Sequence, residues 1–204
     1  MPRFDRPDES AVFLNVPFDP SYEPLFLALI AAITAIGRVP RCVLELPDQG
    51  EGRLSRILRL MGSCAVSIHD LSRVGIPARF NMPFELGLAY AIRHATSPNS
   101  PYRFVLLERV AHRLSRTLSD VSAHDPEIHA GRPLGVIASV LDSLGTGRQM
   151  PSSDDVHRQW RRLMRAARSL RRAERRQTIF SASLFKRTVA ASTELASRAG
   201  FIAD

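Results

Sequence analysis

The chain has 204 residues, of which 45% are hydrophobic, and a net charge of +8; such a length and composition exclude a chain that is disordered throughout. Its two cysteines, Cys42 and Cys64, have no CxxC spacing and lie in apolar stretches, so a zinc site and a disulfide framework are disfavoured and a cytoplasmic location is expected. The longest apolar run, residues 25–36, is too short to cross a bilayer, and the first ten residues show no targeting pattern, so no membrane partner is expected.

The positive charge is concentrated at the C-terminal end of the chain. Residues 1–150 contain 16 Arg and 15 Asp or Glu, a net charge of +1, whereas residues 151–204 contain 12 Lys or Arg and 5 acids, a net charge of +7. We therefore expect an α/β domain over residues 1–150 and a basic helical extension over residues 151–204.

Short apolar runs alternate with helical patterns along the first part of the chain. The runs at residues 11–17, 39–46, 64–69 and 103–108 are typical of buried strands. Helical patterns cover residues 22–36, 53–61, 83–94 and 134–144, and the first of them is followed by Gly37, a suitable residue to end a helix. This alternation predicts a parallel sheet flanked by helices. Residues 113–131 show no clear pattern.

Two further helices are predicted in the basic extension, at residues 154–176 and 184–199. In the first, Val156, Trp160, Leu163, Ala167 and Leu170 can share one apolar stripe. The favoured interpretation is a solvated helix that packs this stripe on its own domain or on a second subunit. A nucleic-acid arm is a less favoured alternative because Trp160 is the only aromatic residue in the Arg-rich run, and a membrane-surface or partner helix is a third.

Polar side chains follow the predicted strands, where a parallel sheet binds its ligands. We expect these side chains to converge on one edge of the sheet: Asn15, Phe18 and Asp19; Glu45 and Asp48; His69, Asp70, Ser72 and Arg73; Asn81 and Glu85.

Glu85 is the leading candidate among them. With Pro83 as the first helical residue, Glu85 lies in the first helical turn, where the helix dipole favours the ionised carboxylate that a nucleophile requires. The same position equally suits a capping glutamate. Asp70 could likewise be a turn former, Asn81 a helix cap and His69 a packed strand-end histidine.

Several common sites are disfavoured by the motifs. No GxGxxG or GxxxxGK[ST] loop follows the first strand, no GxSxG elbow occurs, and the histidines lack metal-binding spacing. We therefore expect neither a metal nor a bound cofactor, and the remaining type of site is centred on carboxylates.

The order VFLNVPF, a buried helix, SIHDLSRV and FNMPFELGLAYA, over about residues 11–110, resembles the nucleoside 2-deoxyribosyltransferase-like and TIR-like proteins of bacteria. The resemblance implies a flavodoxin-like or Rossmann-like sheet, with Glu85 as the catalytic glutamate that attacks the anomeric carbon of a nucleoside or of the ribose that carries nicotinamide. It implies that Asp70 contacts the base and assists its departure, and that Asn15 and Phe18 line the pocket. Asp48, Ser72 and Asn81 are expected to bind substrate.

One departure from the family pattern concerns Arg79, which stands in ARFNMPF where an acid is expected. An arginine here would meet a phosphate and shift the preference towards nucleotides or NAD. TIR-type enzymes commonly assemble to become active, so a homo-oligomer is expected, with the C-terminal helices as a source of contacts. The predicted function is cleavage or transfer of an N-glycosidic bond in NAD, a nucleotide or a nucleoside; the alternative is a nucleotide-signal binding module that acts through a partner without turnover.

Overall fold

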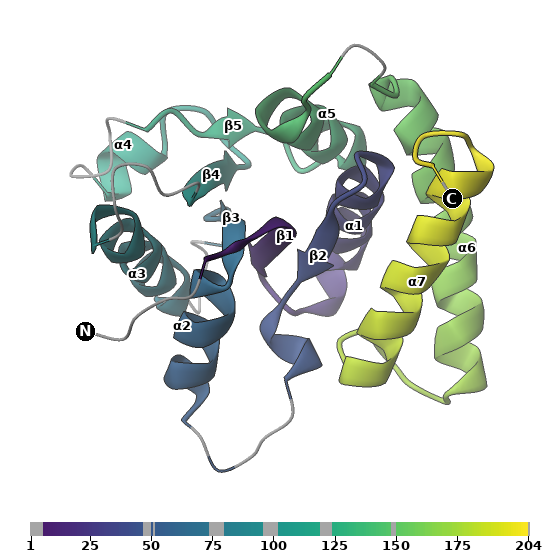
Figure 1. The fold of residues 1–204 in the computed structure, drawn as a ribbon, viewed down its shortest axis with the longest axis horizontal. Helices are drawn as coiled ribbons and strands as arrows, with labels where there is room; N and C mark the ends of the chain where they lie inside the picture. Colours follow the sequence, from purple (N-terminus) through teal and green to yellow (C-terminus); the bar gives the residue numbers. More distant parts are fainter. Residues whose placement is uncertain are drawn as a thin grey trace. The chain divides into compact units, whose positions relative to one another are not determined.

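The computed structural model describes residues 6–46, 50, 52–73, 80–95, 102–118, 124–147 and 150–203. Its strands form one five-stranded sheet with the order β2-β1-β3-β4-β5, and helices flank it (Figure 1). The pairs β1–β3, β3–β4 and β4–β5 are parallel. The predicted α/β parallel-sheet fold is confirmed.

The chain divides into two compact units. We call residues 1–17, 41–43 and 48–130 the sheet unit, and residues 18–40, 44–47 and 131–204 the helical unit. β2 (Val39–Arg41) belongs partly to each of them.

The strands of the sheet unit end level with one another. They are β1 (Asp8–Asn15), β3 (Cys64–Asp70), β4 (Arg103–Glu108) and β5 (Glu127–Ile128). In the register, Asn15 pairs with His69, Asp70 with Leu107, and Glu108 with Ile128. The carboxyl ends of all four strands therefore meet at one edge, as predicted for a parallel sheet.

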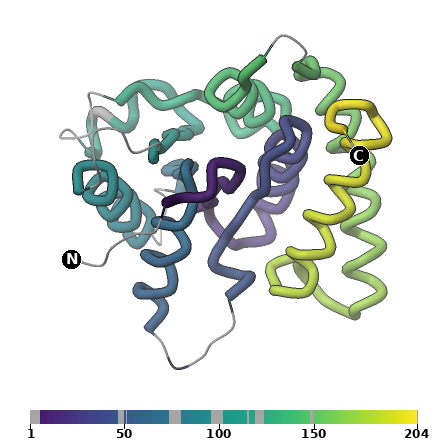
Figure 2. The backbone as a smooth tube through the Cα atoms, in the orientation of Figure 1, coloured from purple at the N-terminus to yellow at the C-terminus, as the bar shows by residue number. Residues whose placement is uncertain are grey.

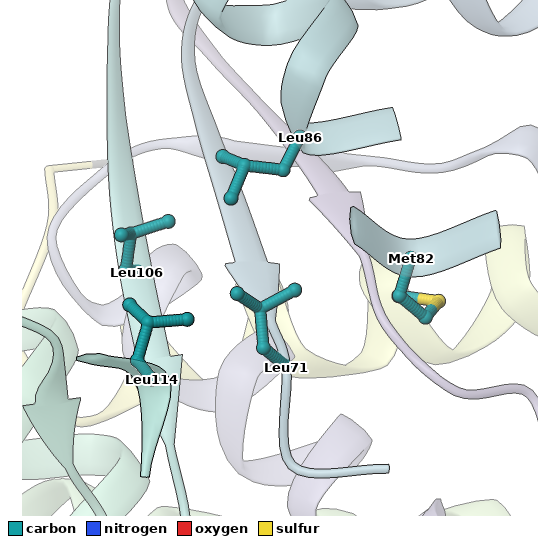
Figure 3. Packing of buried hydrophobic residues seen from close by; sticks show 5 residues of the cluster. All are labelled: Leu71, Met82, Leu86, Leu106 and Leu114. Atoms are coloured by element: carbon teal, nitrogen blue, oxygen red, sulfur yellow. The ribbon is translucent and has the colours of Figure 1, made fainter. Parts of the chain in front are cut away.

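A leucine-rich cluster packs α3 (Asn81–Ala95) on this sheet. Leu86 and Met82 from α3 meet Leu106 of β4, Leu71 after β3 and Leu114 of α4 (Leu114–Thr117), as Figure 3 shows. All five side chains are at most 6% exposed. Burial of this kind contributes on the order of 1.5–3 kcal/mol for each large apolar side chain and fixes the start of α3 near the carboxyl edge of the strands.

α3 begins two residues earlier than predicted, and this changes the position of Glu85. The N–H of Phe84 donates to the carbonyl of Phe80 at 3.3 Å, so Pro83 is the third helical residue. Its missing N–H is one of those that have no acceptor within a helix, so proline costs no hydrogen bond there. The first turn of α3 contains no acid. The prediction of Glu85 in the first turn, and with it the capping-box alternative, is wrong.

Other differences lie in short elements. β2 ends at Arg41, and a 3₁₀ turn at Val43–Glu45 replaces the rest of the strand predicted to Leu46. β5 was not predicted because two residues carry no periodicity. α2 (Arg53–Gly62) has the predicted position to within one residue; it buries Ile57, Leu60 and Met61, whereas Leu54 is 42% exposed.

The helical unit is built around α1 (Glu23–Ala35), in which residues 26–35 are all buried. Within the unit, α1 packs against α5 (Pro133–Leu144), α6 (Ser153–Ala173) and α7 (Ala182–Arg198). Contact on several sides explains why α1 is apolar around its circumference. Gly37 follows it with φ +71°, a conformation that glycine adopts without strain.

The apolar stripe of α6 packs inside this unit, which confirms the favoured interpretation of that helix. Val156, Leu163 and Ala167 are at most 1% exposed. The Trp160 indole N–H donates to the Pro24 carbonyl of α1 at 3.0 Å, and Gln159 Nε2 donates to the Ser192 carbonyl of α7 at 3.1 Å. α6 and α7 run side by side, as the green and yellow segments of Figure 2 show.

Within the described ranges, none of the helices has both the length and the hydropathy needed to cross a membrane.

Candidate active site

Asn15, at the end of β1, ties two neighbouring elements of the sheet unit together. Its Nδ2 donates to Nδ1 of His69 at 2.9 Å and to the Met82 carbonyl at 3.3 Å. The carbonyl can only accept, which fixes the orientation of the Asn15 amide. Asn15 is 3% exposed, and both of its amide protons are used internally. Asn15 therefore holds the first turn of α3 at Met82, and Met82 lies three residues before Glu85.

His69 continues a buried hydrogen-bond chain away from the sheet edge. Because its Nδ1 accepts from Asn15, its Nε2 carries the proton and donates to Ser67 Oγ at 2.9 Å, and Ser67 Oγ lies 2.9 Å from the Tyr102 hydroxyl. Burial lowers the pKa of His69 to about 3 and raises the pKa of Tyr102. His69 is thus a neutral, packed histidine.

Glu85 is a buried carboxylate with few polar contacts to replace the water that it loses. It is 6% exposed, and its Oε1 accepts a hydrogen bond from Asn81 Nδ2 at 3.5 Å. Burial raises the pKa of Glu85, while the hydrogen bond from Asn81 and the charge of Arg53 act in the opposite direction. We expected the ionised form to be favoured by the helix dipole; in this position desolvation dominates instead.

The other buried acids contrast with Glu85. Glu108 binds the guanidinium of Arg113, Asp70 lies 3.3 Å from Nε2 of His129, and Glu23 in the helical unit lies 3.3 Å from Arg171. Among the residues that the structure describes, Glu85 is the buried acid without an ion-pair partner. Buried polar groups are normally well satisfied, and exceptions concentrate at functional sites.

Asp70 lies at the end of β3, and its side chain contacts neighbouring residues of the protein. Its side chain is fully buried; Oδ1 accepts from the Ser72 N–H at 2.8 Å, and Oδ2 faces His129 Nε2. Ser72 Oγ lies 3.0 Å from the same Nε2 atom. In a catalytic Ser-His-Asp triad the acid and the serine use different ring nitrogens. The cluster of Asp70, Ser72 and His129 therefore lacks the geometry of that triad.

Glu108 and Arg113 brace the same end of the sheet. Arg113 Nε donates to Glu108 Oε2 at 3.1 Å, and its Nη2 donates both to Glu108 Oε1 and to the Ser72 carbonyl at 3.0 Å. The sequence interpretation missed Arg113, Glu108 and His129. A two-residue strand before His129 is the one local signal that could have marked it, and it is too short to detect.

The predicted strand-end residues form two groups. Asn15 and His69 are paired in the register and point to the face that carries α3, where Asn81 and Glu85 also lie. Successive side chains of a strand alternate between faces, so Asp70 points to the other face. The structure therefore brings Asn15 near the first turn of α3, and gathers Asp70 with Ser72 and His129 separately.

Three further residues were predicted to bind substrate. Phe18 belongs to the helical unit, where its ring centre is 5.9 Å from that of Phe26 and 5.7 Å from that of Phe180. Asp48 and Arg79 fall outside the described residues. Over the described ranges, no group of three His, Cys, Asp or Glu side chains is arranged to hold a metal ion.

Two exposed aromatic rings flank the start of α3. Phe80 is 80% exposed and Phe84 is 55% exposed. Their i, i+4 spacing puts them on one face of the helix. Large apolar side chains left in water near the start of the helix that carries Glu85 are a suitable surface for a flat ligand.

Comparison with known proteins finds no matching family model, and no significant match among curated proteins or solved structures.

Proposed function

We propose that the protein cleaves or transfers an N-glycosidic bond, with Glu85 as the nucleophile and NAD or a related nucleotide as the substrate. The observation that carries the proposal is the state of Glu85, which is buried at the carboxyl edge of a parallel sheet without an ion-pair partner among the described residues. Retaining such a carboxylate costs stability, which a functional role would explain.

The proposed reaction has two steps. Glu85 Oε attacks the anomeric carbon, the bond from that carbon to the base breaks, and the electron pair of this bond goes to the base nitrogen. Water or an acceptor base then attacks the same carbon and releases Glu85 as a carboxylate, while the proton of the attacking water passes to solvent. This is the two-step logic of a retaining glycosidase.

The surroundings of Asp70 favour NAD over plain nucleosides. An ordinary nucleobase needs a proton as it leaves, and Asp70 was expected to assist. Asp70 is fully buried and bound to Ser72 and His129 on the other face of the sheet. Nicotinamide leaves from a positively charged pyridinium as a neutral molecule and needs no proton. Of the buried acids that the structure describes in the sheet unit, Asp70 and Glu108 both have partners of their own, so a leaving group that needs no proton, such as nicotinamide, suits the site better.

Phe80 and Phe84 support a planar leaving group in this proposal. Stacking of an aromatic base on an exposed ring is worth about 1–3 kcal/mol. Replacing both rings by Ala should raise KM for NAD by about tenfold and change kcat less, because the rings would bind the base before and during the reaction.

Turnover assays with Glu85→Gln test the proposal. The wild-type protein, Glu85→Gln and the exposed control Glu194→Gln are incubated with NAD and with deoxynucleosides, and base release is followed. We expect the control to match the wild type and Glu85→Gln to lose at least about a thousandfold in kcat, as for other nucleophile replacements. Equal turnover by all three proteins would refute the role of Glu85.

A nucleotide-binding module without turnover is the second candidate, and the burial of Glu85 favours it, because burial raises the pKa of this carboxyl and so opposes the ionised form that attack requires. In that case NAD binds saturably to both the wild type and Glu85→Gln, and neither protein releases nicotinamide.

A further inference from the structure

The solvent face of α6 carries an uninterrupted set of arginines. Arg161, Arg165, Arg168 and Arg172 are all exposed, and their spacing puts them on one side of the helix. We call these four residues the arginine stripe. Three more exposed arginines lie beside it or just after the helix: Arg162, Arg175 and Arg176.

These charges are not neutralised by acids in the described part of the chain. Residues 158–176 contain nine arginines and one acid, Glu174. Glu174 is already bound to Arg187 and Ser183 of α7, at 2.8 Å each. Two of the nine arginines form ion pairs, Arg158 with Asp155 and Arg171 with Glu23. Together with the hydrogen bond from Arg187, the charge of a third, Arg176, helps to lower the pKa of Glu174. None of the three belongs to the stripe. The stripe therefore presents its full positive charge to solvent.

The density of this charge is close to that of a nucleic-acid strand. The seven exposed arginines between residues 161 and 176 lie along roughly 22 Å of helix axis, or about one charge per 3 Å. Duplex DNA carries one phosphate per about 3.4 Å along each strand. Arginine is also the residue that binds phosphate oxygens with two hydrogen bonds at once.

A membrane surface fits this helix less well. Helices that lie on bilayers insert apolar side chains below their basic residues. The apolar side of α6 packs inside the helical unit, where Val156, Leu163 and Ala167 are buried, and none of the large hydrophobic residues of α6 is exposed. The solvent-exposed face of α6 carries arginines and has no apolar side chain that could insert into a bilayer.

The end of α6 keeps an arginine in a strained position. Arg175 has φ +51°, and the Arg176 N–H donates to the Arg171 carbonyl at 3.0 Å, which is the Schellman arrangement. Glycine is preferred there because other residues pay about 1 kcal/mol or more in this conformation. An arginine at this position extends the positive surface beyond the last turn of the helix.

From these observations we propose that the arginine stripe is a binding site for double-stranded nucleic acid, held through its phosphates and independent of base sequence. The proposal does not depend on the reaction of Glu85, because all of its residues lie in the helical unit.

Fluorescence anisotropy with a labelled 25-base-pair DNA duplex tests the proposal on the full chain. Three proteins are compared with the wild type. The stripe variant is Arg161→Gln, Arg165→Gln, Arg168→Gln and Arg172→Gln. The conservative variant is R161K, R165K, R168K and R172K, and the charge-matched control is Arg6→Gln, Arg59→Gln, Arg116→Gln and Arg198→Gln. Circular dichroism checks that all four proteins have the same helix content. Anionic vesicles of phosphatidylserine and phosphatidylcholine serve as the second probe.

We expect the wild type, the Lys variant and the control to bind the duplex, with affinity that falls steeply as salt rises. The stripe variant should bind at least about tenfold more weakly, with a salt slope lower by about three to four, because four phosphate contacts are lost. Equal affinity of the stripe variant and the control would overturn the proposal. So would tighter binding of the wild type to vesicles than to the duplex, or no binding of the duplex at low salt.

Discussion

The Glu85 carboxylate accepts a hydrogen bond from Asn81 one helical turn earlier, at an Nδ2–Oε1 distance of 3.5 Å. This long contact is weak compensation for a side chain that is 94% removed from water, since Glu85 is only 6% exposed. The raised pKa of Glu85 follows from this imbalance, and it gives a test that does not need a substrate.

Glu85→Gln should stabilise the fold at neutral pH. The pKa of Glu85 is raised in the folded state, so the free energy of unfolding falls as the pH rises from the ordinary pKa of glutamate to the folded pKa, and it stays low above the folded pKa, where the buried carboxylate must be charged. Below the ordinary pKa of glutamate both states are neutral, and the difference should disappear. Thermal melts of Glu85→Gln and the wild type between pH 4 and pH 8 measure this. A variant that melts below the wild type at pH 7 would show that the charge is compensated.

Asn15→Ala should lower the free energy of unfolding by about 1–3 kcal/mol, because it leaves buried polar groups without partners. The groups that lose their hydrogen-bond donor are His69 Nδ1 and the Met82 carbonyl oxygen. Urea titration measures the loss. Gln177→Ala, which removes an amide from an exposed position, is the control and should change stability by less than about 0.5 kcal/mol. Equal losses in both variants would argue against a special role of Asn15 in fastening α3.

The burial of His69 should make the fold sensitive to acid. His69 has a pKa of about 3 in the fold, against 6.5 for an ordinary histidine. Below pH 6.5 the unfolded chain takes up a proton that the folded chain refuses, so stability from this group is present above pH 6.5 and is lost as the pH falls towards 3. An NMR titration of the histidine ring protons should show that His69 stays neutral at pH 5. Titration of the His69 ring near pH 6.5 would contradict the buried chain through Ser67.

Arg175→Gly should raise the free energy of unfolding by about 0.5–1 kcal/mol, because glycine adopts positive φ without the strain that arginine carries at φ +51°. Arg165→Gly is the matched control inside the exposed face of α6, where the same substitution should cost about 1 kcal/mol. Opposite signs in denaturant titrations are the expected result. A loss at both positions would show that Arg175 has stabilising contacts that outweigh its strain.

The regular part of the fold could be predicted from the sequence because it depends on local periodicity. β4 has the predicted bounds, and α1 was predicted to within a residue at each end. The start of α3 was misplaced because Pro83 is tolerated at the third helical position as well as at the first. β5, with two residues, lies below what periodicity can detect.

For the site, the sequence could predict which edge of the sheet the residues reach, but not which face of the sheet each side chain takes. Parallel strands bring Asn15, Asp70 and Glu85 to that edge, but which face each side chain takes depends on exact strand ends. His129 and Arg113 become partners of Asp70 and Glu108 through contacts that sequence spacing does not encode. The lack of an ion-pair partner for Glu85 among the described residues is also visible only once the surrounding elements are in place.

The central claim, that Glu85 is a nucleophile, is tested most directly by trapping a sugar on it. A 2-fluoro analogue of the NAD ribose slows release of the sugar from the enzyme and allows the protein to be digested and mapped by mass spectrometry. We predict a single sugar adduct on the peptide that contains Glu85, formed with release of one nicotinamide per chain and absent from Glu85→Gln. Nicotinamide release with the adduct on another residue, or undiminished release by Glu85→Gln, would contradict the claim.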